Sequence, residues 1–336
     1  MNKNIKMGIA TLATGLLAAC GGGSSSSPAA TTASATSIGT GTTTTTTQSN
    51  VGSLATPSYA AGSPALAAFN QINAMRQQCG FSEFADNSKL DTSVANHWNY
   101  VNLNGGPNFV GHYETSGKPG FTGVAPTDRA AYVGYPYSGV GEVMAPATTN
   151  IGGANSITTL ASVPYHATAL FGDYAETGII YQQLGSSAGG YYELIEDFGN
   201  QTVSPAAPTI ASSPMTWPCQ NSTNVERENL GGESPTPYVN GAPASNTPGS
   251  WGTPIVVEGN MSDTITLTSV SVTGPNGSVP VSFYDSATDP NHELPGWSAF
   301  AIPNAPLAAT TTYSVVVSGT VNGSPFTRSF SFTTGT

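Results

Sequence analysis

Charge is scarce in this sequence. Charged residues make up only 8% of the 336 residues, and 8 Lys and Arg stand against 19 Asp and Glu. An acidic chain with so few cations repels phosphate backbones, so nucleic acid is excluded as a partner. Neither a His-Glu-x-x-His motif nor a phosphate-binding glycine loop is present, so two common sequence signals of metalloproteases and nucleotide-binding enzymes are missing. After the first twenty residues, no apolar run approaches the length of a membrane span.

Cysteine is nearly absent as well, with three in the chain, and the first follows a short apolar segment. Lys3 and Lys6 precede residues 7–19, which are apolar but too short to cross a bilayer, so residues 1–19 are interpreted as a signal peptide. The last four positions, Leu17-Ala18-Ala19-Cys20, resemble the lipobox of bacterial lipoproteins. This resemblance implies acylation of the Cys20 thiol and a lipid anchor at the cell envelope. An ordinary secretory signal is the alternative.

Two further consequences follow from this beginning. Gly21 stands where an Asp would favour retention at the inner membrane, so the resemblance implies the outer membrane and an extracytoplasmic protein. Removing Lys3 and Lys6 leaves 6 basic and 19 acidic residues, a formal charge of −13. With Cys20 lipidated, Cys79 and Cys219 can pair in only one way, and an exported compartment preserves such a disulfide. Two free thiols are the alternative.

Composition divides the rest of the chain into four segments. Residues 20–56 hold the lipidated Cys and a Gly/Ser/Thr-rich tether with almost no apolar side chains to offset the entropy of ordering. Residues 57–199 form a first domain, residues 200–250 a Pro/Ser/Asn-rich linker, and residues 251–336 a second domain. In the second domain, apolar residues alternate with Thr and Ser, and turn residues separate the runs, which predicts an all-β sandwich.

Helices precede strands in the first domain. Ser63-Pro64 is a helix start, and Leu66, Phe69, Ile72 and Met75 follow at helical spacing up to Gly80. Further helices are predicted from Leu90 to Asn104, from Thr127, and between Ile157 and Phe171 with a break at Pro164. Strand patterns cover residues 178–181 and 192–198. This order predicts an α+β domain in which helices cover a small antiparallel sheet.

A set of short motifs in the first domain resembles the CAP superfamily of cysteine-rich secretory, antigen 5 and pathogenesis-related 1 proteins (SCP-like domains), over roughly residues 64–199. The motifs appear in the family's order: Phe69-Asn70-Gln71-Ile72-Asn73-Ala74-Met75-Arg76, Ala95-Asn96-His97, Gly111-His112, Asp128-Arg129-Ala130, Gly134-Tyr135, Gly141-Glu142-Val143, Tyr165-His166 and Asp197-Phe198-Gly199. The resemblance implies a CAP-type α-β-α sandwich. The second domain resembles bacterial immunoglobulin-like modules, on Thr312-Tyr313-Ser314-Val315 and Phe330-Ser331-Phe332-Thr333-Thr334.

The CAP resemblance also implies a cleft with two His and two acidic residues that can bind a divalent metal. Its motifs place the first His at His112, one acid at Glu142 and the second His at His166. The second acid would fall near Ser162 or Val163, where there is no carboxylate. Two imidazoles and one carboxylate can still hold Zn²⁺, so weak zinc binding stays an option, although no cofactor is certain. We interpret His97 as structural, because it shares a helix face with apolar residues. Glu114 follows His112 by two residues and is an alternative source of the missing carboxylate, but we interpret it as part of a solvated loop.

Three functions agree with this sequence. The leading one is a non-enzymatic binding module for an apolar or glycan ligand, or for a protein partner, in the cleft of His112, Glu142 and His166. The first alternative is a metal-dependent hydrolase that uses the same cleft. The second is a structural or adhesive surface protein with a vestigial cleft. The missing second carboxylate favours binding over chemistry.

Overall fold

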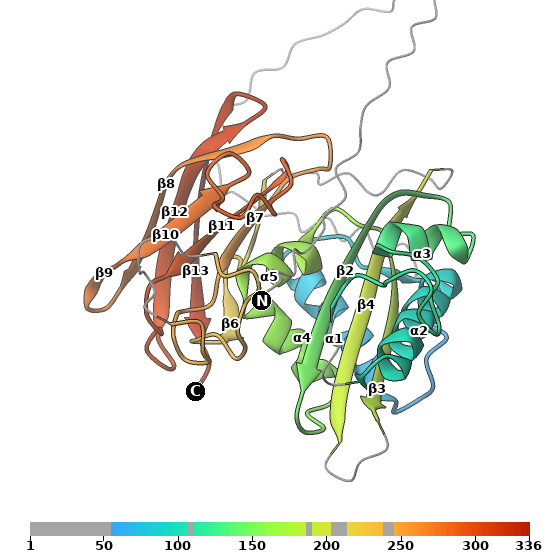
Figure 1. Ribbon diagram of the computed structural model, residues 1–336. Helices are drawn as coiled ribbons and strands as arrows, with labels where there is room; N and C mark the ends of the chain where they lie inside the picture. The colour runs from blue at the N-terminus through green and yellow to red at the C-terminus, as the bar shows by residue number, and fades with distance from the viewer. Residues whose placement is uncertain (1–54, 107–110, 186–189, 203–213, 238–244) are drawn as a thin grey trace, which may run out of the picture.

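The computed structural model describes residues 55–106, 111–185, 190–202, 214–237 and 245–336 (Figure 1). The predicted signal peptide, Cys20 and most of the predicted tether lie outside the described residues. The described part is a mixed α/β protein with five helices and three sheets, arranged as two units side by side (Figure 1). None of its helices is long and apolar enough to cross a membrane.

The first unit contains all five helices, close to where the sequence predicts them. They are α1 (Pro64–Gln78), α2 (Ser88–Leu103), α3 (Pro126–Tyr132), α4 (Gly153–Ala161) and α5 (Pro164–Phe171). The Ser63 hydroxyl caps α1 by accepting the N–H of Leu66, and the side chain of Asn87 caps α2 in the same way. Pro164 separates α4 from α5 because proline suits the first turn of a helix but not its interior.

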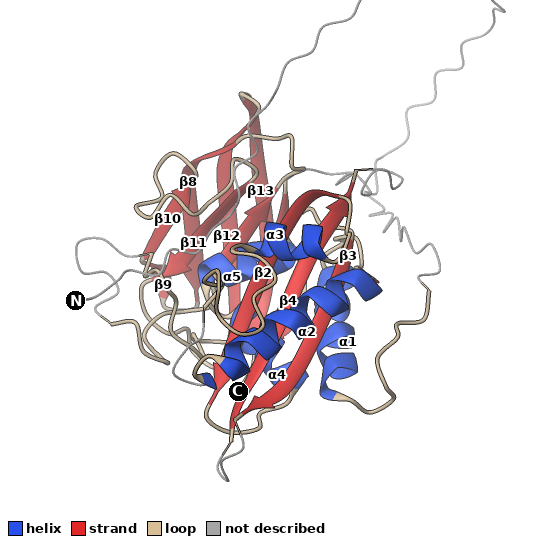
Figure 2. Ribbon diagram, turned by 45° about the vertical axis from the view of Figure 1, so that its right-hand side comes forward, coloured by secondary structure: helices blue, strands red, loops and turns tan. Residues whose placement is uncertain are grey.

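One four-stranded sheet lies between these helices. Its strands are β1 (Ala85–Asp86), β2 (Tyr137–Ala147), β3 (Glu176–Leu184) and β4 (Tyr191–Gln201), in the order β1-β3-β4-β2. Successive residues of β2 point to opposite faces of the sheet and enter different apolar cores. Val143 packs with residues of α1 and α4, and Met144 packs with residues of α2. The helices therefore cover both faces of the sheet, and β2 is an edge strand (Figures 1 and 2).

The second unit is built from two packed sheets. One has the order β10-β11-β7-β5 and the other β6-β13-β12-β8-β9. The strands are β5 (Met215–Trp217), β6 (Ser222–Val225), β7 (Ile255–Glu258), β8 (Ile265–Gly274), β9 (Gly277–Val279), β10 (Val281–Asp285), β11 (Ser298–Pro303), β12 (Thr312–Val321) and β13 (Ser324–Thr334). Alternating apolar side chains such as Leu267, Val315 and Phe332 form the core between the sheets.

The predicted linker, residues 200–250, is more than a linker. It contributes β5, which pairs with β7, and β6, which pairs with β13. Each of these strands is only three or four residues long and lies in a Pro- and Asn-rich segment, so the sequence shows no strand pattern for them. The disulfide between Cys79 and Cys219 is confirmed and joins this segment to the end of α1, with 5.4 Å between the two Cα atoms.

The two units share apolar cores. Met215, Trp217 and Val256 of the second unit pack in the same cluster as Phe69 and Phe171 of the first. A second mixed cluster joins Val163 and Tyr165 of the first unit to Trp251, Leu294, Phe300 and Ile302 of the second. Helix α5 lies at this junction, between the first sheet and the β-sandwich (Figure 1). The apolar side chains buried in these shared clusters stabilise the packing of the two units against each other.

Candidate functional site

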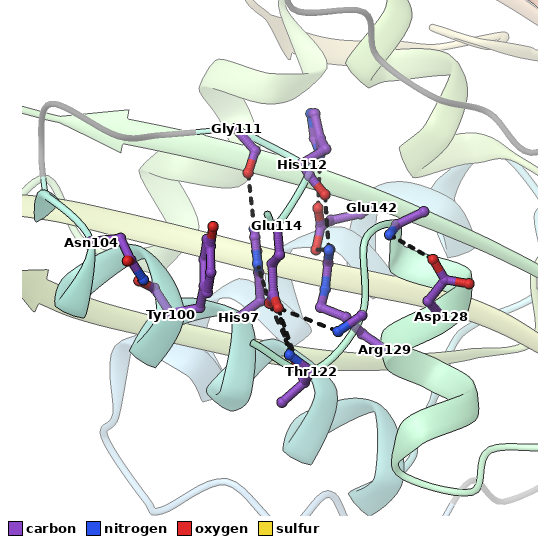
Figure 3. Close-up of polar contacts among 12 residues, drawn as sticks. His97, Tyr100, Asn104, Gly111, His112, Glu114, Thr122, Asp128, Arg129 and Glu142 are labelled. Atoms are coloured by element: carbon purple, nitrogen blue, oxygen red, sulfur yellow. Dashed lines mark hydrogen bonds and ion pairs between the residues drawn. The ribbon is translucent and has the colours of Figure 1, made fainter. Parts of the chain in front are cut away.

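A buried polar cluster lies over the edge of the first sheet (Figure 3). Glu142 projects from β2, and His112 comes from the segment that precedes α3. The Nδ1 atom of His112 lies 2.8 Å from Oε1 of Glu142. The Glu142 side chain is fully buried, whereas 13% of the His112 side chain is exposed. The structure therefore brings together two of the three predicted site residues.

Arg129 of α3 ties this pair in place. One guanidinium nitrogen, Nη2, donates to Oε2 of Glu142 at 2.5 Å, and Nη1 donates to the backbone carbonyl of His112 at 2.9 Å. Arg129 is fully buried. Burial by itself raises the pKa of Glu142, but Arg129, followed by His97 and His112, holds it below its ordinary range. Glu142 is therefore a permanent carboxylate with both oxygens engaged.

The neighbour of Glu142 across the sheet behaves in the opposite way. Asp197 of β4 is the register partner of Glu142 and is also fully buried. Burial raises the pKa of Asp197 well above its ordinary value, and the negative charge of Glu142 raises it further, against the pull of Arg129. Where two buried carboxyls share one cation, the cation favours the ionised form of Glu142, and burial together with the Glu142 charge favours the protonated form of Asp197.

A second His–Glu contact lies beside this cluster. His97 of α2 is fully buried, and its Nδ1 lies 3.0 Å from Oε1 of Glu114, while its Nε2 lies 3.0 Å from the carbonyl oxygen of Gly111. Glu114 also accepts the backbone N–H of Thr122 at 2.7 Å. The prediction of a solvated loop at Glu114 is wrong: the loop folds over α2, and these donors replace water around a carboxylate that is 3% exposed. His97 is buried, in keeping with its predicted structural role.

His166 lies elsewhere. Its Nδ1 is 2.7 Å from Oε1 of Glu233, which comes from the segment between β6 and β7. The other oxygen of Glu233 accepts the backbone N–H groups of Tyr165 and His166, at 2.8 and 3.4 Å, in the first turn of α5. Tyr165, Thr168 and Ala169 face the His112 side, and one residue along a helix turns by about 100°, so His166 faces another neighbour.

Little space is left at the His112–Glu142 pair. The cavity that both residues line has a volume of about 30 Å³, which suits about one water molecule. Its other walls come from α5 and from Pro295, Trp297 and Ser298, in and after the segment between β10 and β11. Residues of the second unit therefore cover the His112–Glu142 pair.

A much larger groove opens beside this cavity. It has a volume of about 440 Å³ and lies between β2 and the segment of residues 292–297. Both units contribute to its walls: Tyr137, Val140 and Tyr174 come from the first, and Met261 and Trp297 from the second. Tyr174, Pro295 and Trp297 line the small cavity as well, so the groove and the His112–Glu142 pair are neighbours.

The side chains as placed do not fit the predicted zinc site. Glu142 is already bound by Arg129, whose positive charge opposes a second cation, and His166 is held by Glu233. In the part of the chain that the structure describes, no three His, Cys, Asp or Glu side chains are grouped as ligands of one ion.

Comparison with known proteins adds no assignment. No protein-family model matches the chain, and no curated protein shows significant similarity to it.

Sequence reasoning missed the roles of Arg129 and Glu233. Arg129 stands in the motif Asp128-Arg129-Ala130, but nothing in that motif says which carboxylate the guanidinium meets. Glu233 lies 67 residues beyond His166. Composition gives no signal for the Arg129 partner either, because the other buried arginine, Arg76, donates to backbone carbonyls and not to a carboxylate.

Proposed function

We propose that this chain is a lipid-anchored, extracytoplasmic binding protein, in which a CAP-type module and an immunoglobulin-like module together form one ligand site. The ordered motifs around His112, Glu142 and Tyr165-His166 support the CAP assignment, as does a sheet with helices on both faces. Two packed sheets with apolar side chains between them support the immunoglobulin-like assignment.

One observation favours binding over chemistry. The His112–Glu142 pair borders a cavity of about 30 Å³, whereas the groove beside it measures about 440 Å³ and lies within the range of small-ligand sites. A substrate the size of the groove cannot reach the pair unless the segment of residues 295–298 moves. The proposed ligand therefore occupies the groove, next to the predicted cleft, and its body is small and largely apolar.

Native mass spectrometry tests this proposal. Protein expressed from residue 20 onward with Cys20→Ser, and purified without detergent, is expected to retain or take up a small ligand in a one-to-one ratio. Replacing Trp297 by Ala removes one wall of the groove and should abolish that complex, whereas replacing Tyr132, which is 66% exposed and lies outside the groove, should leave it intact. If the Trp297→Ala variant keeps the same ligand at the same occupancy, the groove is not the site.

The anchor is tested separately. Cys20→Ser should shift the protein from the membrane fraction to the soluble fraction or leave an unprocessed precursor, because the sulfur that would carry the acyl chains is gone. If a mature-size Cys20→Ser protein is found in the membrane fraction, the lipobox assignment is wrong.

The metal-dependent hydrolase is the weaker alternative, because it requires His166 to leave Glu233 and Glu142 to leave Arg129. Calorimetric titration with Zn²⁺ tests it. Uptake that is lost in both His112→Ala and His166→Ala, but kept in His97→Ala, would revive this alternative.

A further inference from the structure

The groove between the two units runs along the free edge of the first sheet. Four successive residues of β2, from Tyr137 to Val140, line it on one side. Successive side chains of a strand point to opposite faces of the sheet, so four side chains in a row cannot all reach one groove. Gly139 has no side chain, and that of Val140 packs with Ala130 and Tyr135 in an apolar core. These four residues share the backbone edge of the strand, and this edge forms the wall.

The register of the sheet shows which backbone groups point outward from this edge. Val140 is the register partner of Gly199 in β4, and the carbonyl oxygen of Gly199 accepts the N–H of Ala175, beside β3, at 3.3 Å. Val140 and Gly199 are therefore a non-hydrogen-bonded pair, so the N–H and C=O of Val140 point away from β4. Pro146 lies six residues further along β2 and has the same orientation, which means that its missing N–H costs no bond to β4.

The outward groups of Val140 have no partner in the part of the chain that the structure describes. Strand β4 is the only described strand that pairs with β2, which lies at the edge of its sheet (Figure 1). Among the described residues, no other backbone or side-chain group bonds the N–H or C=O of Val140. A strand edge with free N–H and C=O groups is a template on which a further strand can pair.

The surroundings of the edge limit its occupant to a short chain. Beyond the groove, residues 141–143 of β2 border the small cavity, whose other walls come from α5 and residues 295–298. The open part of the edge is therefore the four residues at the groove, which span about 10 Å. Pairing of β2 with the β2 of a second copy needs a longer free edge, so a short peptide segment fits better than a second copy.

The remaining walls favour apolar side chains on such a peptide. An added strand continues the sheet, so its side chains point to the same two faces as those of β2. Met261 lies over one of these faces, because a Cβ atom on Gly139 would be only 3.1 Å from the Met261 methyl carbon. Tyr174, Leu294 and Trp297 line the groove as well. Apolar side chains on the peptide can therefore be buried against this lining.

A free strand edge beside an apolar lining matches one class of ligand. An extended peptide pairs its main chain with such an edge, and its side chains provide the specificity. We infer that the groove binds an extended apolar peptide segment of about three or four residues, which pairs with Val140 as an additional strand of the first sheet. This inference rests on the proposed function, because it takes the groove as the ligand site and names the class of its ligand.

A peptide with and without N–H groups tests the pairing. The probe is an acetylated pentapeptide amide of alternating valine and threonine, and its control is the same peptide with every amide nitrogen methylated. Methylation keeps the side chains and adds apolar surface but removes the donors. Calorimetry measures the binding of each to protein expressed from residue 20 onward with Cys20→Ser. The methylated peptide is expected to bind at least about tenfold more weakly, as the loss of one or two hydrogen bonds requires.

Amide exchange, followed by NMR, assigns the pairing to β2. At a free peptide concentration of about ten times the Kd, exchange of the Val140 N–H should slow about tenfold, because only the free protein exposes it. The N–H of Gly141 is the internal control, since it points toward β4 and should keep its rate. Val140→Pro removes the donor without removing a bond to β4 and should weaken peptide binding about tenfold or more. If this variant fails to fold, as judged by circular dichroism, the exchange of Val140 in the protein without this substitution decides.

The other outcomes overturn the inference in different ways. Equal binding of both peptides, or a Val140 exchange rate that the peptide does not change, would refute the strand pairing and leave the groove open to another ligand, so the proposed function would stand. Exchange of Val140 as slow as that of Gly141 before peptide is added would show that the edge is already covered, by a second copy if the rate depends on protein concentration. If neither peptide binds, the inference fails, and the mass-spectrometric test decides the proposed function independently.

Discussion

Two His–Glu pairs of almost equal length serve different ends in this molecule. His112 and Glu142 lie 2.8 Å apart within the first unit, where Arg129 binds the same carboxylate. His166 and Glu233 lie 2.7 Å apart across the junction of the two units, where Glu233 also accepts backbone N–H groups of α5. The third partner sets the role of each pair. The buried guanidinium of Arg129 keeps Glu142 ionised. The backbone N–H groups at the start of α5 instead bind Glu233, so that this pair links the two units.

Loss of Arg129 should have the largest effect. Arg129→Met leaves the Glu142 carboxylate buried without its main partner, which is expected to cost about 3–5 kcal/mol of unfolding free energy in urea denaturation. Arg227→Met is the matched control, since Arg227 pairs with Glu228 in a partly exposed contact and should cost less than about 1 kcal/mol. The double variant Arg129→Met/Glu142→Gln should recover part of the loss. Equal stability of Arg129→Met and wild type would show that Arg129 does not set the charge state of Glu142.

A third buried carboxyl, on the strand next to β2, lacks a cation partner of this kind and should make stability depend on pH. Glu196 of β4 is fully buried, and desolvation raises its pKa to about 8, against a lowering by the Thr177 hydroxyl and Arg76. Its ordinary value is 4.5, so the folded state holds this proton more tightly than the unfolded state. The stability it contributes is complete below pH 4.5 and is lost as pH rises toward 8.

Glu196→Gln removes this pH-dependent loss. We compare the free energy of unfolding of the variant with that of wild type at each pH. The variant's advantage over wild type should be larger at pH 9 than at pH 5, by an amount on the order of 3–5 kcal/mol. Chemical denaturation at the two pH values measures it. A wild-type-to-variant difference that does not change with pH would mean that Glu196 is ionised in the folded protein at both values.

Loss of the Glu233 charge should have a smaller effect, confined to the junction. Glu233→Gln keeps the shape of the side chain but gives up its interaction with His166 and with the α5 helix end, which is expected to cost about 1–2 kcal/mol. Hydrogen exchange should quicken in α5 and in residues 294–297, and stay unchanged in α2. Uniform quickening across both units would contradict the junction role.

The smallest effect is expected at His112. His112→Asn removes one contact to a carboxylate that Arg129 still neutralises, so the loss should be about 1 kcal/mol in the same urea experiment. A loss as large as that of Arg129→Met would make His112, and not Arg129, the main partner of Glu142.

Local signals predicted the helices well. Ser63, Pro64 and Pro164 act on the residues beside them, so their effects can be recognised without knowledge of the rest of the fold. Strand β2 escaped prediction, although it carries Glu142, because Gly139, Gly141 and Pro146 interrupt its strand pattern. The reason for Gly141 lies outside the strand: the Tyr174 hydroxyl occupies the space of its missing side chain.

The candidate site was predictable only in part. The motif match placed His112 near Glu142, and the two do meet. It could not place Glu233 beside His166, or Trp297 and Ser298 over the cleft, because these contacts depend on how the second unit packs against the first. Neither a helical repeat nor a strand repeat encodes a contact between surfaces that are more than 60 residues apart in the chain.

The parallel pairing of β6 with β13 joins two strands that lie far apart in the chain. Strand β6 ends at Val225, but its partner begins at Ser324, near the end of the chain. All strands of the first sheet lie before residue 202, and Cys219 follows closely in the chain. The sandwich, in contrast, must wait for the final dozen residues. A stop codon that removed only the last strand would therefore leave residues 222–225 without their partner, although every strand of the first sheet would still be present.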